Sequence, residues 1–289
     1  MTGDWMWIDD RKKIELARRD ICSSDVIAVD TEYDSFRYFR EKLCLIQIMT
    51  GRQTYLFDPF EHLDFSFLGD VFADDRITKI MHAGDNDVRI LKRDYGFFFK
   101  NIFDTYRAAS LLGCQYLSLS NVVHHYLGIS LDKSKKMQRS QWETRPLSEE
   151  QLRYAVMDTK HLIELYNVLN SFLLRHGLKE KAFSSFTGVE TIRWTEKTLD
   201  QWGFLRIPGA DELNDIQLRR LEALFLWRFE TARRTNRARF MILSDTVLID
   251  LSRETFDTLA SLNGSGILTP QKIRDFGQEI LETLKTADG

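Results

Sequence analysis

The sequence predicts an α/β or α+β sheet domain followed by a smaller, all-helical domain. Short apolar runs rich in β-branched residues fill the N-terminal part and are typical of buried strands. Runs with 3.6-residue periodicity follow from about Asp87 onward and indicate helices. Gly203, Pro208 and Gly209 interrupt the chain, and no convincing strand follows them. We therefore expect a sheet domain at residues 1–195, a linker at 196–210 and a helical domain at 211–289.

Four apolar runs account for the expected strands. A helical pattern around Ile14 precedes the first run, 26–30 (Val-Ile-Ala-Val-Asp). The run 43–49 follows, and a turn at 51–53 leads into the run 54–57, so the spacing predicts an antiparallel meander of three strands. Ile77 to Met81 predicts a fourth strand.

The apolar positions between Gln151 and Leu174 fit one long helix. Ser148 and Gln151 are spaced as a capping box, which marks the start of a helix. Gly177 is typical of a helix end. Three further helices are expected in the tail, at 213–234, 245–251 and 270–284.

Composition restricts the class of protein. With 289 residues, 43% hydrophobic and 29% charged, the chain is typical of a globular protein. A net charge of −3 does not indicate general nucleic-acid binding, which would need local basic patches. We find no signal peptide and no apolar run near the roughly 18 residues that span a membrane. Three cysteines without C-x-x-C spacing favour reduced thiols and a cytoplasmic location.

Two carboxylates leave the first strand together. Asp30 and Glu32 are two residues apart, so on a strand both side chains point to the same face. Like charges held this close repel one another, and Mg²⁺ or Mn²⁺ is the natural occupant between them. The alternative is that both acids are solvated where the strand frays into a loop.

Further acids follow the fourth strand and lie within the long helix. Asp85 and Asp87 stand at a helix start, where carboxylates also occur as simple caps. Tyr154 and Asp158 are four residues apart and share one helix face. The alternative is an exposed polar face, although Asp158 lies close to the apolar stripe.

Together, four converging carboxylates could hold two divalent ions about 3.5–4 Å apart, the arrangement that catalyses phosphodiester hydrolysis. One ion would activate a water, and the other would stabilise the leaving 3′-oxygen. The tyrosine hydroxyl could orient the attacking water.

These motifs resemble a known nuclease family. The order D-x-E, H-A-G-x-x-D and Y-x-x-x-D, from Asp30 to Asp158, resembles the tyrosine-bearing branch of the DEDD 3′→5′ exonucleases. The stretch from Leu131 to Ala155 is very similar to ribonuclease D, and the resemblance spans roughly Trp7 to Leu174. It implies a ribonuclease H-like fold, with a mixed sheet flanked by helices.

The resemblance also implies residue roles. Asp30, Glu32, Asp87 and Asp158 would bind two divalent cations, Mg²⁺ or Mn²⁺, and Tyr154 would position the nucleophilic water. Asp87 is preferred to Asp85 because it keeps the family's spacing from His82.

The activity expected from the resemblance is removal of nucleoside 5′-monophosphates from RNA 3′ ends, on substrates like transfer-RNA precursors. The expected partner is RNA with a free 3′ end, bound by a monomer away from membranes. The alternatives are a proofreading or repair exonuclease acting on single-stranded DNA, and an inactive RNA-binding module.

The tail is similar to the helicase-and-ribonuclease-D C-terminal (HRDC) domain, around 221–228 and 240–245. Such a module is an auxiliary nucleic-acid-binding unit, and one copy fits. Basic side chains with an aromatic neighbour suit a single strand, although charge runs are often solvated faces and Trp142 could be core. The expected nucleic-acid contacts are Lys133, Lys135, Lys136, Arg139, Trp142, Arg233 and Arg234.

Overall fold

The computed structural model describes residues 5–131, 137 and 140–289, and these form two compact units. The first unit consists of Met1–Asp34 and Lys42–Thr195. The second consists of Ser35–Glu41 and Glu196–Gly289, so its chain is discontinuous. Each unit has its own hydrophobic core and is described separately.

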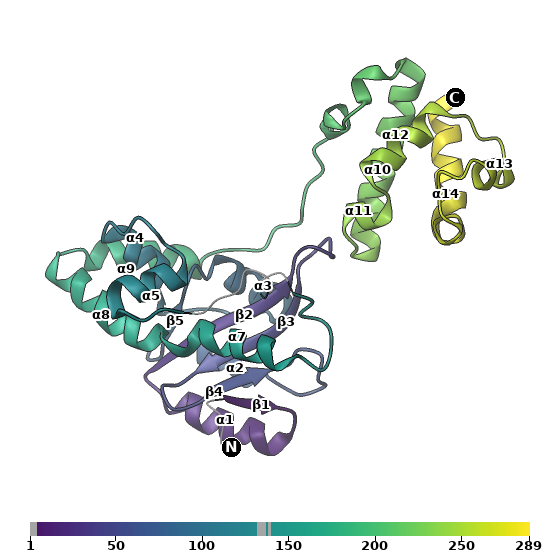
Figure 1. The fold of residues 1–289 in the computed structure, drawn as a ribbon. Coiled ribbons are helices and arrows are strands. Elements are labelled where there is room, and N and C mark those ends of the chain that lie inside the picture. The colour runs from purple at the N-terminus through teal and green to yellow at the C-terminus, as the bar shows by residue number, and fades with distance from the viewer. Residues whose placement is uncertain (1–4, 132–136, 138–139) are drawn as a thin grey trace. The chain divides into compact units, whose positions relative to one another are not determined.

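A six-stranded mixed sheet forms the centre of the first unit (Figure 1). Its strands are β1 (Trp5–Ile8), β2 (Val26–Asp34), β3 (Lys42–Met49), β4 (Thr54–Phe57), β5 (Thr78–Met81) and β6 (Ile102–Asp104). They are ordered β1-β4-β3-β2-β5-β6. Pairing is antiparallel between β2 and β3 and between β3 and β4, and parallel elsewhere. The predicted three-strand meander is therefore confirmed, whereas β1 and β6 were not predicted.

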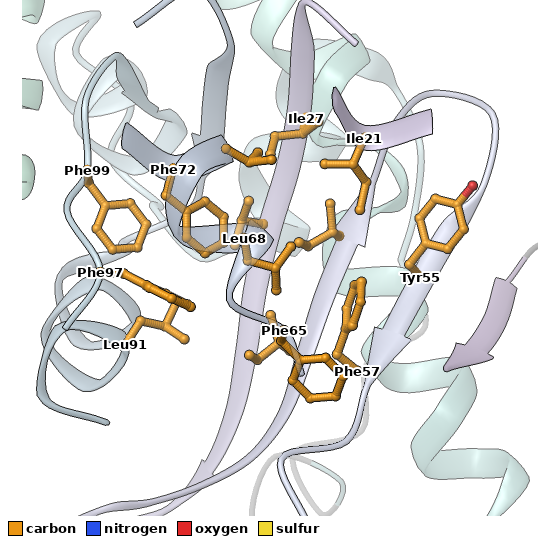
Figure 2. Packing of buried hydrophobic residues seen from close by; sticks show 14 of the residues in the cluster. Ile21, Ile27, Tyr55, Phe57, Phe65, Leu68, Phe72, Leu91, Phe97 and Phe99 are labelled. Atoms are coloured by element: carbon orange, nitrogen blue, oxygen red, sulfur yellow. The ribbon is translucent and has the colours of Figure 1, made fainter. Parts of the chain in front are cut away.

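Helices cover both faces of this sheet. They are α1 (Arg11–Cys22), α2 (Phe67–Ala73), α3 (Asp85–Tyr95), α4 (Thr105–Leu111), α5 (Leu119–Leu127), α7 (Glu149–Lys160), α8 (Leu162–Arg175) and α9 (Lys179–Glu190). On one face, α1, α2 and α3 pack on alternate residues of β2 such as Ile27 and Val29 (Figure 2). On the other face, Ala28 packs with α4, α5 and α8. None of the helices in the described parts of the chain is long and apolar enough to cross a membrane.

The long helix predicted between Gln151 and Leu174 is in fact two helices, α7 and α8, separated at His161. Ala155 and Val156 of α7 pack in a cluster with β3 and β4. Leu162 and Leu165 of α8 pack in a different cluster with α4 and α5. Because each helix packs on its own apolar surface, one straight helix cannot bury both sets. The capping box at Ser148 is as predicted, and α8 ends at Arg175, two residues before Gly177, which predicted a helix end.

The second unit is helical. It contains the 3₁₀ turns η1 (Gly203–Arg206) and η2 (Ala210–Glu212) and the helices α10 (Asp215–Thr235), α11 (Arg239–Ile242), α12 (Asp245–Arg253), α13 (Leu259–Gly264) and α14 (Pro270–Asp288). This unit includes residues 196–210, the stretch expected to be a linker. Phe204, Ile207 and Ala210 are buried in its core, and so is Phe39 from the first of its two chain segments.

Candidate active site

Strand β2 carries the first two acids on one face of the sheet. Asp30 pairs with Gln47 of β3, and Glu32 pairs with Leu45. Alternation places both carboxylates on the same face as Ala28, the face covered by α7 and α8. A register shift between Glu32 and Tyr33 interrupts the ladder directly after the second acid. Such irregularities bend a strand and redirect its side chains.

Helix α7 supplies the facing side chains. Its start is held by the capping box, in which the Gln151 backbone N–H donates to Ser148 Oγ at 3.2 Å and the Ser148 N–H donates to Gln151 Oε1 at 3.0 Å. Tyr154 and Asp158 follow on one helix face. Asp158 is only 9% exposed, which does not fit the alternative of a solvated polar face.

The structure brings Asp30, Glu32 and Asp158 together, with one carboxylate oxygen of each lying within 4.8 Å of the others. Glu32 and Asp158 are buried. Three carboxylates this close repel one another strongly unless a cation lies between them. Carboxylate oxygens are the ligands that Mg²⁺ and Mn²⁺ prefer, so the donor set fits a divalent ion.

Asp87 is not part of that group of three. It lies on α3, and its carboxylate accepts a hydrogen bond from the hydroxyl of Thr31, between the two acids of β2. Burial raises the pKa of Asp87 to about 6, and the negative charge of Asp104 adds to this effect. Asp87 and Asp30 both act on the Tyr33 phenol, whose pKa is raised to about 12 chiefly by burial. The fourth acid therefore lies outside the group of three and is held on the Thr31 side of β2, although its charge and that of Asp30 both act on the Tyr33 phenol.

The H-A-G turn before α3 has a structural explanation. Both ring nitrogens of His82 are engaged, Nδ1 with Thr105 Oγ1 at 2.8 Å and Nε2 with the Leu117 carbonyl at 2.9 Å. Ala83 has a positive φ of 55°, and a Cβ on Gly84 would lie 2.8 Å from the Met81 side chain. His82 therefore shapes the turn and does not act as a base.

Two further acids near this turn have different roles. Asp104 accepts hydrogen bonds from the backbone N–H groups of Gly84 and Arg107, and thus ties the turn to the start of α4. Asp85 forms an ion pair with Arg107 at 2.6 Å. The fold thus separates Asp85, which has a cation partner, from Asp87, which faces β2.

Tyr154 lies next to the three converging acids. Its pKa is raised, first by burial and then by the charges of Glu32 and Asp30. The side chain therefore stays a neutral phenol at physiological pH and can donate a hydrogen bond. The centroid of its ring lies 5.9 Å from the centroid of the Trp142 ring.

Arg145 holds the segment that leads into α7, a role that the sequence did not reveal. Its Nε and Nη2 atoms donate to the two carboxylate oxygens of buried Asp58, at 2.5 and 2.8 Å. Its other bonds reach the carbonyl oxygens of Cys44 and Trp142, each at 2.6 Å, and of Thr144 at 3.2 Å. In the sequence, Asp58 follows β4 and precedes Pro59, a dipeptide typical of a turn, and it gives no sign of an ion pair with Arg145.

The structure tests some of the expected nucleic-acid contacts. Trp142 is 1% exposed and packs in the core beside Leu45 and Ala155, so it cannot stack on a base, contrary to expectation. Arg233 and Arg234 are exposed but form ion pairs with Glu230 and Glu279. Four other expected contacts, Lys133, Lys135, Lys136 and Arg139, lie outside the described residues.

Comparison with known families agrees with this arrangement. A 3′-5′ exonuclease domain model matches residues 5–173, and an HRDC domain model matches residues 217–284. The chain therefore belongs to the 3′-5′ exonuclease family, of the DEDD type, and carries one HRDC domain.

Relatives and solved structures share both parts. The exosome complex component 10 homolog of Drosophila melanogaster is 30% identical over 96% of this chain and 32% of its own length. The catalytic core of RRP6 from Trypanosoma brucei superposes with a TM-score of 0.86 at 25% identity, over 97% of this chain and 79% of that one. Escherichia coli RNase D, described as an exoribonuclease involved in structured RNA processing, gives 0.71 at 26% identity, over 98% and 75%. The chain spans about a third of the length of the first curated relatives it matches.

Proposed function

We propose that this protein is a metal-dependent 3′→5′ exoribonuclease that removes nucleoside 5′-monophosphates from RNA 3′ ends. The observation that carries the proposal is the convergence of Asp30, Glu32 and Asp158 within 4.8 Å, beside a neutral Tyr154. A family match alone would also fit an inactive module, but such a module has no need to keep three mutually repelling acids in a partly buried cluster.

Asp30, Glu32 and Asp158 would hold one divalent ion, and Asp87 together with Asp30 would hold a second. Bound divalent ions lower the pKa of a water molecule and stabilise the leaving 3′-oxygen. Mg²⁺ and Mn²⁺ both suit an all-carboxylate donor set, and we propose either as the cofactor.

The protein's own groups orient the substrate and the water. The Tyr154 hydroxyl donates to the attacking water or to a phosphate oxygen, and the rigid start of α7 holds it in place. Asp87, held by the Thr31 hydroxyl, keeps its carboxylate aimed at the end of β2. Such preorganised groups are worth about 10²- to 10³-fold in rate each.

The proposed substrates are RNAs with a free single-stranded 3′ end, such as transfer-RNA precursors. The names of the relatives, which include exosome components and RNase D, support RNA over DNA. The expected basic contacts, Lys133, Lys135, Lys136 and Arg139, and the paired Arg233 and Arg234, remain proposals for phosphate binding. A cytoplasmic location is also proposed, on the free cysteines Cys22, Cys44 and Cys114.

A nuclease assay on matched RNA and DNA strands tests the proposal. Strands labelled at either end, with and without Mg²⁺ or Mn²⁺, report polarity, polymer preference and metal dependence together. We expect stepwise shortening from the 3′ end of RNA, abolished by chelator and by Asp30→Asn or Asp158→Asn.

Asp85→Asn is the matched control, because Asp85 is also an acid of the α3 start but is paired with Arg107. It should retain activity. Cleavage that survives chelator or the Asp30→Asn change would refute the two-ion site. Faster cleavage of DNA than of RNA would instead favour a DNA exonuclease.

A further inference from the structure

An open pocket of about 740 Å³ lies within the second unit, apart from the groups that make up the metal site. Its walls come from both chain segments of that unit. Ser35, Phe36 and Phe39 contribute from the short first segment, while Phe240 and Arg239 contribute from α11. Nothing in the catalytic proposal uses these side chains.

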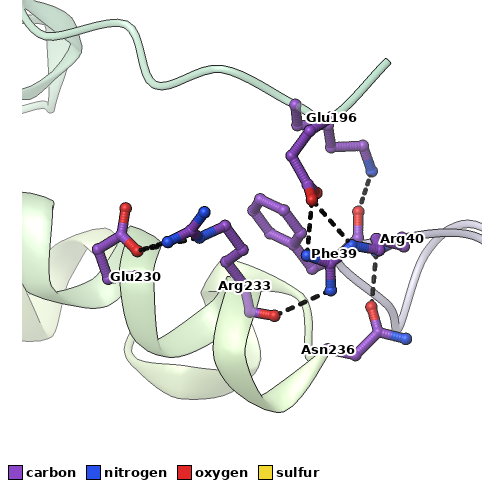
Figure 3. A network of polar contacts seen from close by, with 7 residues as sticks. Phe39, Arg40, Glu196, Glu230, Arg233 and Asn236 are labelled. Atoms are coloured by element: carbon purple, nitrogen blue, oxygen red, sulfur yellow. Dashed lines mark hydrogen bonds and ion pairs between the residues drawn. The ribbon is translucent and has the colours of Figure 1, made fainter. Parts of the chain in front are cut away.

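The short segment is held firmly against the end of α10 (Figure 3). The Arg40 guanidinium donates to Glu196 at 2.7 and 3.1 Å and to the Arg233 carbonyl at 3.1 Å. Its backbone N–H donates to the Asn236 side chain at 2.8 Å, and the Ala238 N–H donates to the Arg37 carbonyl at 2.9 Å. Phe39 packs edge-on against Phe229 in the core. The pocket wall is therefore built by specific contacts.

Two aromatic rings that line this pocket are exposed to solvent. Phe36 is 67% exposed and Phe240 is 50% exposed, with ring centroids 4.9 Å apart and planes tilted by 42°. Mutual packing explains why the rings are adjacent, but it leaves most of the Phe36 surface in water. The Arg37 guanidinium lies 6.0 Å from the Phe36 ring centroid. Paired open rings beside a cation are typical of surfaces that stack nucleobases.

Positive charge exceeds negative charge around the pocket. Four basic side chains line it, Lys197, Arg206, Arg228 and Arg239, against the acids Asp200 and Asp245. Arg206 pairs with Asp200, Arg228 with Asp245 and Lys197 with Glu41. Among the described residues, Arg239 has no ion-pair partner. A local positive excess on a chain of net charge −3 favours a polyanionic ligand.

We propose that this pocket binds single-stranded RNA, with a base stacked on Phe36 and Phe240 and a phosphate contacted by Arg239. An acidic peptide would match the charge, but it would not need the two open rings. The assignment rests on the proposed function for the choice of RNA as ligand. It adds a site for nucleotides upstream of the one that is cleaved.

The length of chain between Glu32 and Phe36 sets an upper limit on their separation. Phe36 follows Glu32 by four residues, a chain length of at most about 14 Å. A stacked strand advances about 3.4 Å per nucleotide, so about four nucleotides cover that length. A dinucleotide whose single phosphodiester lies at the metal acids has no further nucleotide to place in the pocket, whereas a strand of four or more nucleotides has.

RNA binding to the full chain carrying Asp30→Asn, in chelator, tests the proposal without any need for catalysis. Fluorescence anisotropy compares a single strand of about a dozen nucleotides with a dinucleotide. We expect Phe36→Ala and Phe240→Ala each to weaken binding of the longer strand about fivefold or more, and to leave the dinucleotide unchanged. Phe36→Trp should restore binding, and 4-thiouridine in the longer strand should cross-link to either ring position.

Phe98→Ala is the matched control, because Phe98 is 75% exposed and lies in the first unit. Affinity falls as salt rises, so the slope of log affinity against log salt concentration is negative. Arg239→Gln should make this slope shallower by about 0.7, whereas Arg19→Gln on α1 should leave it unchanged. Unchanged binding by variants with unchanged melting temperature would overturn the proposal. An equal loss of affinity for the longer strand and for the dinucleotide would also overturn it. So would tighter binding of an acidic peptide than of RNA. Because the assay needs no cleavage, these results are independent of the nuclease assay.

Discussion

Replacing Glu32 with Gln removes one of three carboxylates that lie within 4.8 Å of one another. At that separation, two unit charges repel by about 0.9 kcal/mol at the dielectric of water and about 3.5 kcal/mol at an effective dielectric of 20. Glu32 faces both Asp30 and Asp158, so the change relieves two repulsions. Because Asp30 is partly exposed to solvent, we expect the lower end, about 2 kcal/mol.

In the absence of metal, the variant should therefore be more stable than the wild-type protein. For a unit of this size, about 2 kcal/mol raises the melting temperature by roughly 4–8 °C. When Mn²⁺ is added, the wild-type protein should become the more stable of the two. An ion at 100 times its dissociation constant stabilises the wild-type protein by about 2.7 kcal/mol, and the variant should lose most of this gain.

Thermal unfolding with chelator and with saturating Mn²⁺ measures both effects on the same samples. Asp85→Asn serves as the control, because it removes a carboxylate that is already neutralised by Arg107. It should not raise the melting temperature in chelator, and it should keep the metal-dependent rise. A Glu32→Gln protein that is less stable in chelator, yet stabilised by Mn²⁺ as much as the wild type, would refute the shared-ion explanation of this cluster.

Three other changes separate the roles of nearby groups. Tyr154→Phe should keep the metal-dependent rise in melting temperature but slow single-turnover cleavage about 10²-fold; normal cleavage would exclude the hydroxyl from the reaction. Burial raises the pKa of Asp87 to about 6, above its unfolded value of 3.8, so this group favours folding at low pH and that contribution is lost as pH rises through 6. The metal-free melting temperature of Asp87→Asn relative to wild type should therefore increase between pH 4 and pH 6.5, and a constant difference would contradict the shift. Arg145→Gln should destabilise the protein by about 3–5 kcal/mol in chemical unfolding, because it leaves the buried carboxylate of Asp58 without its cationic partner. Arg153→Gln, which breaks an exposed pair on α7, should cost at most about 1 kcal/mol; similar losses for both would contradict the role of Arg145.

The local motifs could be predicted because they depend on short-range geometry. A two-residue spacing on a strand placed Asp30 and Glu32 on one face, and a four-residue spacing on a helix did the same for Tyr154 and Asp158. The convergence of these two pairs could be expected only from the family resemblance. No local pattern indicates which strand faces which helix.

Features that depend on tertiary packing were missed or mistaken. Thr31 looked like a spacer between two acids, yet its hydroxyl holds Asp87. Trp142 stands among basic residues in the sequence, but the surfaces of β3 and α7 bury it. The break at His161 is set by two different apolar surfaces, and the periodicity of the sequence runs through it without interruption.

The discontinuity of the second unit also affects how this chain can fold and be divided. Arg40 and Glu196 form an ion pair across 156 residues of sequence, so a nascent chain presents one wall of the unit long before the other exists. Until then, Phe39 has no core to enter, and its ring adds apolar surface to a partly made protein. A fragment starting at Glu196 would likewise lack Phe39 and the anchoring Arg40. The HRDC-containing unit is therefore a module by sequence similarity, but it cannot be excised intact by a single cut.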